Sequence, residues 1–292
     1  MKPLRDLLDQ IEPHVSKGGR FQAFGSFYEA IDTLVFSPGF QTRTGSHVRD
    51  GLDYKRMMLL VVLALGPCLG FALWNTGFQA ALAIEAGAAP LADWQNSLFQ
   101  SLGGVYDSGH IGWNLLFGAL YFLPVFIVVH VVGLGIEIVT AQIRDLEVTE
   151  GFLVTGALLP LILPPTIPLW QVALGVAFGL IIGKEVFGGT GMNFLNPAMT
   201  CRAFLFFAYP AYMSGEAALA GASWMDAFLG FVPGSMGETS TLACMLGAAL
   251  LIWTGIGSWR TMFGVLLGTI VMAGFLNVVG SDSNPFFGVP WY

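Results

Sequence analysis

Charged side chains are scarce in this chain of 292 residues, because only 11% of them are Asp, Glu, Lys or Arg. A soluble globular domain carries about 25%. Hydrophobic residues make up 55% of the chain, and its mean hydropathy is +0.70. A soluble domain cannot bury apolar side chains in such excess, so that class is excluded. The composition predicts an all-α protein that crosses a membrane several times.

Cysteine and histidine are also scarce. Cys68, Cys201 and Cys244 lie far apart in apolar surroundings, without a CxxC pair or the spacing of metal ligands. This pattern gives no disulfide framework and no metal site, and it predicts three buried thiols. His130 lies inside an apolar segment, and no second histidine within a span stands at a facing position. A structural role for His130 is therefore favoured over haem ligation.

Long apolar runs, by contrast, are frequent. A helix that crosses a bilayer needs about 20 apolar residues. The chain is predicted to have seven spans, at residues 57 to about 78, 111 to about 138, 152–163, 169–182, 194–209, 242–256 and 262–279. The third is short for a full crossing, so we expect it to end irregularly. The 38 glycines agree with this prediction, since small residues allow membrane helices to approach closely.

Two regions follow from these runs. Residues 1–56 are polar and charged and are predicted to be a cytoplasmic segment, whereas residues 57–292 form the membrane domain. Leu4, Leu7, Leu8 and Ile11 recur at helical spacing, so a short amphipathic helix and a solvated tail both remain open for the N-terminal segment. Because the chain stops just after the last span, we expect it to be part of a longer protein.

The basic residues predict an orientation. Eight of the twelve Lys and Arg precede the first span, which puts the N-terminus in the cytoplasm. Alternation then puts the 79–110 and 210–238 loops outside, and neither contains Lys or Arg. Arg144, Lys184 and Arg260 fall inside. Arg202 lies within a span, so we expect a carboxylate or phosphate partner for it.

The stretch 233–243, PGSMGETSTLA, begins at a turn on the outer face, and its acid, Glu238, is followed by three consecutive hydroxyl residues that lead into an apolar segment. Thr239 or Ser240 is well placed to cap the following helix. A cap explains one hydroxyl, but it explains neither the other two nor Glu238. A helix N-terminus also favours phosphate, so a phosphate ester on Thr239 is the alternative to a simple cap.

A second stretch, residues 188–198, combines glycines with Asn193 and the pair Asn196-Pro197. Proline restricts the residue before it, which predicts a broken helix, and broken helices at membrane depth line cavities. The two asparagines would share one face of a helical turn, where their amides suit a flat ring with imide edges. The alternative is a loop cap with helix–helix contacts. No Gly-Lys-Ser/Thr follows, so the stretch is not a P-loop.

Ionisable residues within or beside spans are a further sign of function, because intramembrane charge is costly. Lys184 and Glu185 stand at the end of a span, where an interfacial pair is predicted. Glu137 follows the run Gly133-Leu-Gly135 near the inner end of its span. It could contact an ion or a quinone headgroup, or its side chain could extend to the membrane surface.

Several motifs together resemble one family, the B subunits of the bacterial sodium-translocating NADH:quinone oxidoreductases. The motifs are His47–Asp50, Lys55–Met58, Leu163–Val172, Gly183–Gly191, Asn193–Ala198, Arg202–Pro210 and Gly234–Thr241. The D subunit of the related Rnf complex shares the Asn-Pro and Gly-Glu-Thr-Ser elements. It is therefore one alternative, and a non-redox transporter or channel of similar fold is another.

The resemblance implies that the threonine of Gly237-Glu238-Thr239-Ser240 carries FMN through a phosphoester bond made outside the cytoplasm by a flavin transferase. It implies a noncovalent riboflavin, for which we expect contacts with Asn193 and Asn196. It also implies a ubiquinone site near Gly133 and Glu137.

The partners that the resemblance implies are the other subunits of a six-subunit complex in the bacterial inner membrane, Na⁺ and lipid, with no nucleic acid. The enzyme would be an NADH:ubiquinone reductase that exports Na⁺. The family fold resembles urea transporters, with two inverted repeats of five helices. Seven spans are too few for two such repeats, so C-terminal spans with further acids for sodium passage are expected to be missing.

Overall fold

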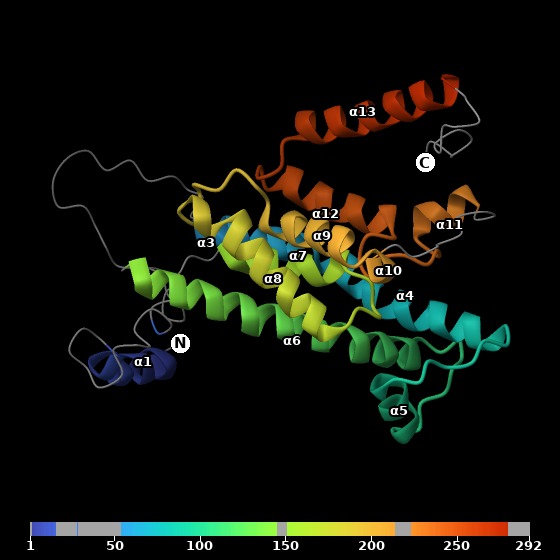
Figure 1. The fold of residues 1–292 in the computed structure, drawn as a ribbon, viewed down its shortest axis with the longest axis horizontal. Helices are drawn as coiled ribbons and strands as arrows, with labels where there is room; N and C mark the ends of the chain where they lie inside the picture. The colour runs from blue at the N-terminus through green and yellow to red at the C-terminus, as the bar shows by residue number, and fades with distance from the viewer. Residues whose placement is uncertain (1, 16–27, 29–53, 145–150, 214–222, 280–292) are drawn as a thin grey trace.

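The structure is a computed structural model that describes residues 2–15, 28, 54–144, 151–213 and 223–279. The predicted motif His47–Asp50 lies outside the described residues. All regular secondary structure in the described part is helical, which confirms an all-α protein (Figure 1). The helices are α1 (Lys2–Val15), α3 (Tyr54–Ala64), α4 (Gly66–Glu85), α5 (Trp94–Ser101), α6 (Ile111–Arg144), α7 (Gly151–Ile162), α8 (Leu169–Gly183), η2 (Glu185–Phe187), α9 (Pro197–Ala208), α10 (Pro210–Met213), α11 (Trp224–Leu229), α12 (Thr241–Trp253) and α13 (Trp259–Val278).

Each of the seven predicted spans contains an apolar helix, but the helices fall into two classes. Four are long enough to cross a membrane, at Arg56–Glu85, Ile111–Arg144, Leu169–Phe187 and Trp259–Val278. The others, α7, α9 and α12, have 12, 12 and 13 residues. A helix of that size is about 18–20 Å long, which is shorter than the roughly 30 Å hydrocarbon core. Three predicted spans are therefore short helices that cannot cross alone.

The N-terminal helix α1 is formed, so of the two alternatives for the N-terminal segment the amphipathic helix is confirmed. Leu8 on this helix is buried, while Ile11 is 40% exposed. Farther along, α3 and α4 form one nearly continuous apolar rod. It is interrupted at Leu65, and a proline stands in the first turn of α4. The first span consequently continues to Glu85, beyond its predicted end near residue 78.

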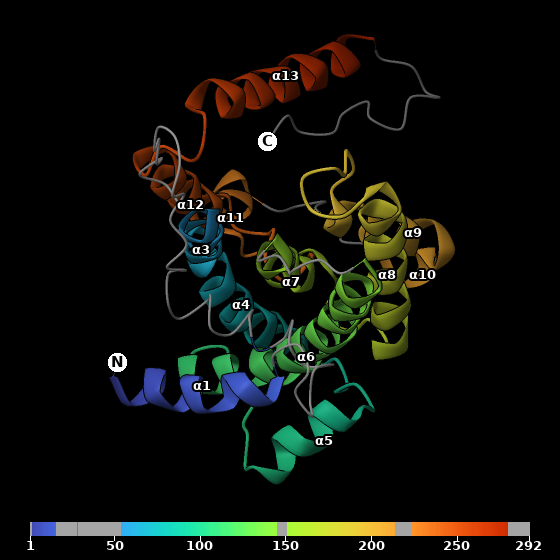
Figure 2. The same cartoon turned by 90° about the vertical axis from the view of Figure 1, so that its left-hand side faces the viewer.

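The centre of the bundle is the short helix α7, which Figure 2 shows surrounded by α3, α4, α6, α8 and α9. Its side chains Phe152, Leu159, Leu161 and Ile162 are all buried and belong to the main core cluster. At the opposite extreme, α13 has no buried residue and diverges from the other helices (Figure 1).

Glycines bring α4 and α6 into direct backbone contact. A Cβ atom built on Gly118 of α6 would lie 1.8 Å from the carbonyl oxygen of Leu73, and one on Gly77 of α4 would lie 2.1 Å from that of Asn114. Only glycine permits this crossing, which agrees with the role of small residues in membrane helix packing. The contact fixes α4 and α6 as one rigid wall of the bundle.

The bundle has two ends, named here by the residues that mark them. At the Glu85 end lie the last turns of α4, the helix α5 and the turn between α7 and α8. At the Arg144 end, the last turn of α6 meets η2. The charge pattern of the sequence predicts that the Glu85 end faces outward.

Candidate functional site

The segment that contains Thr239 leads into α12. Ser240 is the N-cap of that helix, because its Oγ accepts a hydrogen bond of 3.3 Å from the backbone N of Ala243. Of the two predicted capping residues, the structure therefore selects Ser240. Thr239 points elsewhere, and its Oγ1 accepts a hydrogen bond of 3.4 Å from Nδ2 of Asn75 on α4. The cap and the adjacent hydroxyl are thus separate features.

Backbone hydrogen bonds hold this segment against the end of α7. The backbone N of Met236 donates to the carbonyl of Leu163 at 3.1 Å, and that of Gly237 donates to Leu161 at 2.7 Å. A Cβ on Gly237 would lie 2.7 Å from the side chain of Leu161, so this approach needs glycine. Two short helices thereby meet through irregular backbone whose polar groups are paired within the protein, as required at membrane depth.

Arg202 has the acidic partner that its position in a span predicts. Its Nη1 lies 2.9 and 2.6 Å from the two carboxylate oxygens of Glu238, and Ser235 Oγ donates to the same carboxylate at 2.9 Å. The side chains of Arg202 and Glu238 are 35% and 43% exposed, so the pair contributes about 1 kcal/mol or less to stability. The ion pair places the Arg202 cation beside Glu238, the residue that precedes Thr239.

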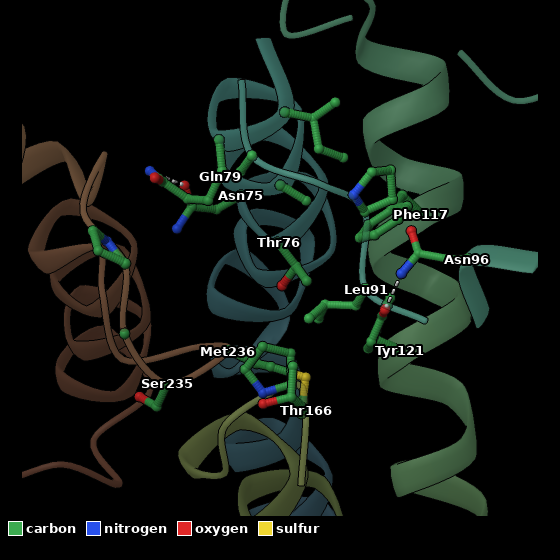
Figure 3. Close-up of a pocket in the computed structure, with 18 of the residues that line it drawn as sticks. Asn75, Thr76, Gln79, Leu91, Asn96, Phe117, Tyr121, Thr166, Ser235 and Met236 are labelled. Atoms are coloured by element: carbon green, nitrogen blue, oxygen red, sulfur yellow. Dashed lines mark hydrogen bonds between the residues drawn. The ribbon is translucent and has the colours of Figure 1, made fainter. Parts of the chain in front are cut away.

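A cavity of about 370 Å³ opens beside this segment (Figure 3). Its walls come from α4, the 88–91 loop, α5, α6, the Pro165-Thr166 turn and residues 233–236. Most of the lining is apolar, and it also includes seven polar side chains, namely Asn75, Thr76, Gln79, Asn96, Tyr121, Thr166 and Ser235. Asn75 both lines the cavity and bonds Thr239, and Gln79 donates to Asn75 Oδ1 at 3.4 Å. A line of amides thus connects the cavity to the Thr239 hydroxyl.

The far wall of the cavity is a network of polar and aromatic side chains. Asn96 Nδ2 donates to Tyr121 Oη at 2.8 Å, and Tyr106 Oη donates to Asn96 Oδ1 at 2.8 Å. Tyr121 Oη donates to the carboxylate of Asp93, which also caps α5. The ring of Phe99 packs edge-on against Phe117 at 5.2 Å. Because each of these polar groups has a partner, the network gives the cavity a fixed shape.

The sequence interpretation missed Asn75, Gln79, Asn96 and Tyr121. For Asn75 and Gln79 the sequence did contain a signal, because these two amides stand four residues apart, on one face of an otherwise apolar span. Nothing local pointed to Asn96 or Tyr121, because their role depends on the packing of α5 against α6.

At the Arg144 end, the ionisable residues are paired differently from the prediction. Lys184 Nζ forms an ion pair with Glu137 of α6, and both side chains are only 5% exposed. Glu185 pairs instead with Arg144, whose Nη1 lies 2.9 Å from Glu185 Oε2. The prediction that Lys184 and Glu185 pair with each other is therefore wrong, and the alternative that Glu137 extends to the surface is also wrong. Two ion pairs join α6 to the end of α8.

Lys184→Met is expected to lower the free energy of unfolding by about 3–5 kcal/mol, because it leaves the Glu137 carboxylate buried without its partner. The double variant Lys184→Met, Glu137→Leu removes both charges and should recover most of that loss. Thermal unfolding in detergent measures both variants. Equal destabilisation by the single and the double variant would contradict this description of the pair.

Gly133 and His130 are packed against the core helix α7. A Cβ on Gly133 would lie 2.1 Å from the ring of Phe152, so a side chain there would displace that ring. His130 Nδ1 is hydrogen-bonded to the backbone oxygen of Phe126 at 2.9 Å, and its ring lies 4.0 Å from the ring of Phe126. These contacts hold the His130 ring in one orientation, and its structural role stays a prediction.

Asn193 and Asn196 do not share a helical face, so that part of the prediction is wrong. Asn196 is the N-cap of α9, and its Oδ1 accepts from the backbone N of Ala198 at 3.0 Å. Asn193 precedes the helix and donates to the carbonyl of Leu195 at 2.7 Å. The helix begins at Pro197, because a proline needs no N–H partner in the first turn. The loop-cap alternative describes Asn196 correctly.

The three thiols are also arranged differently from the prediction. Cys201 is buried against the glycines of α8, and Cys68 is buried as well, but Cys244 is exposed. The Sγ atoms of Cys68 and Cys244 lie 3.7 Å apart. Within the described residues, no group of three or more His, Cys, Asp or Glu side chains is placed to hold a metal ion.

Comparison with known proteins adds an independent result to this geometry. Residues 41–291 match the model of a family described as NQR2, RnfD, RnfE. A protein of Chromohalobacter salexigens, named as the B subunit of Na(+)-translocating NADH-quinone reductase, is 48% identical to the chain over 99% of its length and 76% of the relative. Proteins of the same name from Ectopseudomonas mendocina and Pseudomonas aeruginosa are 50% and 49% identical, over 99% of this chain and 78% of each relative. This chain is therefore a member of the NQR2, RnfD, RnfE family.

Proposed function

We propose that this chain is the membrane subunit of a sodium-translocating NADH:ubiquinone reductase and that Thr239 carries FMN as a phosphoester. The names of its relatives support the enzyme assignment. The observation that supports the attachment site is the location of the Thr239 hydroxyl, which is not used as a helix cap and bonds a residue of the cavity wall. This observation favours the flavin-carrying protein over a transporter of similar fold.

The residues around Thr239 suit a flavin phosphate ester in three respects. Asn75 donates a hydrogen bond to Thr239 Oγ1. An esterified oxygen still has a lone pair that can accept this bond, so the bond can persist when Thr239 carries the flavin phosphate. The N-terminus of α12 and the cation Arg202 favour a phosphate nearby. The adjacent cavity, at about 370 Å³, has the size and the apolar lining of a small-molecule site, with amides that match the imide edge of a flavin ring.

FMN, when bound, supplies electron-transfer chemistry that amino-acid side chains do not provide. The residues of this chain bind and orient it. Asn75 and Gln79 would hold the polar edge of the ring, the apolar cavity lining would exclude water, and Gly237 and Glu238 would hold the attachment segment against α7 and Arg202.

Other sites are part of the same proposal. Riboflavin would lie near Asn193 and Asn196, where α9 begins after irregular backbone. Ubiquinone would bind near Gly133 and Glu137, beside the buried pair with Lys184. The N-terminus would face the cytoplasm, and the Glu85 end with Thr239 would face outward, where a flavin transferase acts. The partners would be the other subunits of the complex in the bacterial inner membrane, Na⁺ and lipid.

A gel assay tests the attachment. The chain is produced with a flavin transferase, denatured and separated by electrophoresis, and the gel is viewed under excitation of flavin fluorescence. A fluorescent band at the mass of the chain is expected, since an ester bond survives denaturation. A band without fluorescence would contradict a flavin-carrying protein and favour the non-redox transporter.

A substitution that fills the cavity should leave flavin attachment intact while it lowers the rate of quinone reduction. Thr76 lines the cavity, and its Oγ1 donates to a backbone carbonyl of its own helix, so Thr76→Phe adds volume with little loss of bonding. We expect the covalent flavin to be retained, its visible absorption spectrum to shift, and quinone reduction by the assembled complex to fall about tenfold or more, because a misplaced reacting group can cost two orders of magnitude.

Thr269→Phe is the matched control, because Thr269 makes the same kind of backbone bond on the exposed helix α13. It should leave both the spectrum and the rate unchanged. An unshifted spectrum in Thr76→Phe would mean that the flavin ring occupies another place.

A further inference from the structure

Two cysteines from distant parts of the sequence meet where α4 and α12 pack together. Their Sγ atoms are 3.7 Å apart, although 176 residues separate them in the chain. Both stand near the N-terminal ends of their helices. Cys68 is only 6% exposed, whereas Cys244 is exposed. The pair is thus close enough to react and differs in access to reagents.

We propose that Cys68 and Cys244 are a site of reversible oxidation to a disulfide that links α4 to α12. A disulfide has an S–S bond of about 2.05 Å, so the two sulfurs must approach by roughly 1.6 Å. Side-chain rotation and a small helix adjustment can supply that movement. The difference in exposure assigns the roles, with Cys244 as the thiol that an oxidant meets first and Cys68 as the resolving thiol.

The reaction balances with a small-molecule disulfide as the oxidant. The Cys244 thiolate attacks one sulfur of the reagent, forms a mixed disulfide and releases one thiol. The Cys68 thiolate then attacks the Cys244 sulfur, which forms the Cys68–Cys244 bond and releases the second thiol. Two protein thiols are oxidised, the reagent is reduced to two thiols, and the two protons of the cysteines end on them.

The Cys68–Cys244 disulfide would shift the segment that contains Thr239. Cys68 and Asn75 are seven residues apart, which puts them two turns apart on the same face of α4. Thr239 precedes Cys244 by five residues and bonds Asn75. Drawing the start of α12 toward α4 therefore presses the Thr239 segment onto Asn75 and restricts access to the hydroxyl. This consequence rests on the proposed function of Thr239 as the flavin acceptor.

Counting thiols in the full chain tests the bond itself. Membranes are treated with dipyridyl disulfide and then washed with a mild thiol, which reduces mixed disulfides but leaves an internal disulfide in place. The chain is denatured, and its free thiols are labelled with a maleimide polymer that shifts the gel band. The sequence has three cysteines, so the untreated wild type should carry three labels. The treated wild type should carry one, the label on Cys201.

Single variants are the controls for this count. Cys201→Ser should fall from two labels to none on treatment, because both remaining thiols enter the disulfide. Cys68→Ser and Cys244→Ser should each keep two labels, since the wash recovers a thiol that has no internal partner. Protection of two thiols in the wild type and in Cys201→Ser, but in neither of the other variants, supports the disulfide. Protection that persists in Cys68→Ser or Cys244→Ser, or none in the wild type, overturns it.

A second measurement tests the consequence for Thr239. The chain is produced without flavin, oxidised or left reduced, and then incubated with FAD and a flavin transferase. The initial rate of flavin attachment should fall several-fold on oxidation of the wild type and stay constant in Cys244→Ser. If two thiols are protected but the rate of flavin attachment is unchanged, the proposed restriction of access to Thr239 is overturned. Absence of attachment even in the reduced wild type would instead contradict the proposed function, while the thiol count would still decide the disulfide.

Discussion

Thr239→Val is expected to abolish the covalent flavin fluorescence of the denatured chain, whereas Thr241→Val should retain it. The two substitutions remove a hydroxyl of the same kind two residues apart. Thr239 bonds Asn75 at the cavity wall, whereas Thr241 is the exposed first residue of α12. Valine nearly preserves the shape of threonine but has no oxygen to form an ester.

Gel fluorescence normalised to the amount of chain measures this effect. The cap of α12 comes from Ser240, so Thr239→Val should leave the helix folded, and the thermal unfolding of the two variants can be compared to verify this. Fluorescence retained in Thr239→Val, or lost in Thr241→Val, would place the attachment at a different residue.

Gly118→Val is expected to destabilise the packed helix bundle. Its Cβ would lie 1.8 Å from the carbonyl oxygen of Leu73, so α4 and α6 would have to separate. Overpacking a tight contact costs about 1–3 kcal/mol, and more where, as here, the obstacle is backbone that cannot rotate away. Because both helices also line the cavity, the variant should lose both folded protein and the wall of the candidate site.

Gly135→Val on the same helix is the control. A Cβ at Gly135 meets no atom within 4 Å, so the substitution changes the residue in the same way without a clash. The fraction of monodisperse protein after extraction and the unfolding temperature in detergent compare the two. Similar values for both variants would show that the α4–α6 crossing is not as close as described.

The sequence predicted those features that depend on neighbouring residues. Each apolar run contains a helix, since a run of that length has few alternatives in a membrane. The hydroxyls before α12 were predicted to include its cap, and Asn196-Pro197 was predicted to interrupt a helix. These are local signals, and most of the observed helices begin and end within a few residues of the predicted bounds.

Contacts between distant segments could not be predicted in the same way. Lys184 bonds Glu137, 47 residues away, and Arg202 bonds Glu238, 36 residues away. No local pattern identifies such a partner, although the cost of an unpaired charge in a membrane did require that Arg202 have one. The cavity is a similar case, because its walls come from several parts of the chain that meet only after α4, α6 and α7 have packed.

The most direct test of the central proposal is a mass measurement on the chain produced with its flavin transferase. After proteolysis, the peptide that contains Thr239 should carry the added mass of FMN less one water, and fragmentation should locate it on Thr239. The same peptide found wholly unmodified, or modified on Ser240 or Thr241 instead, would contradict the proposal that Thr239 holds the flavin.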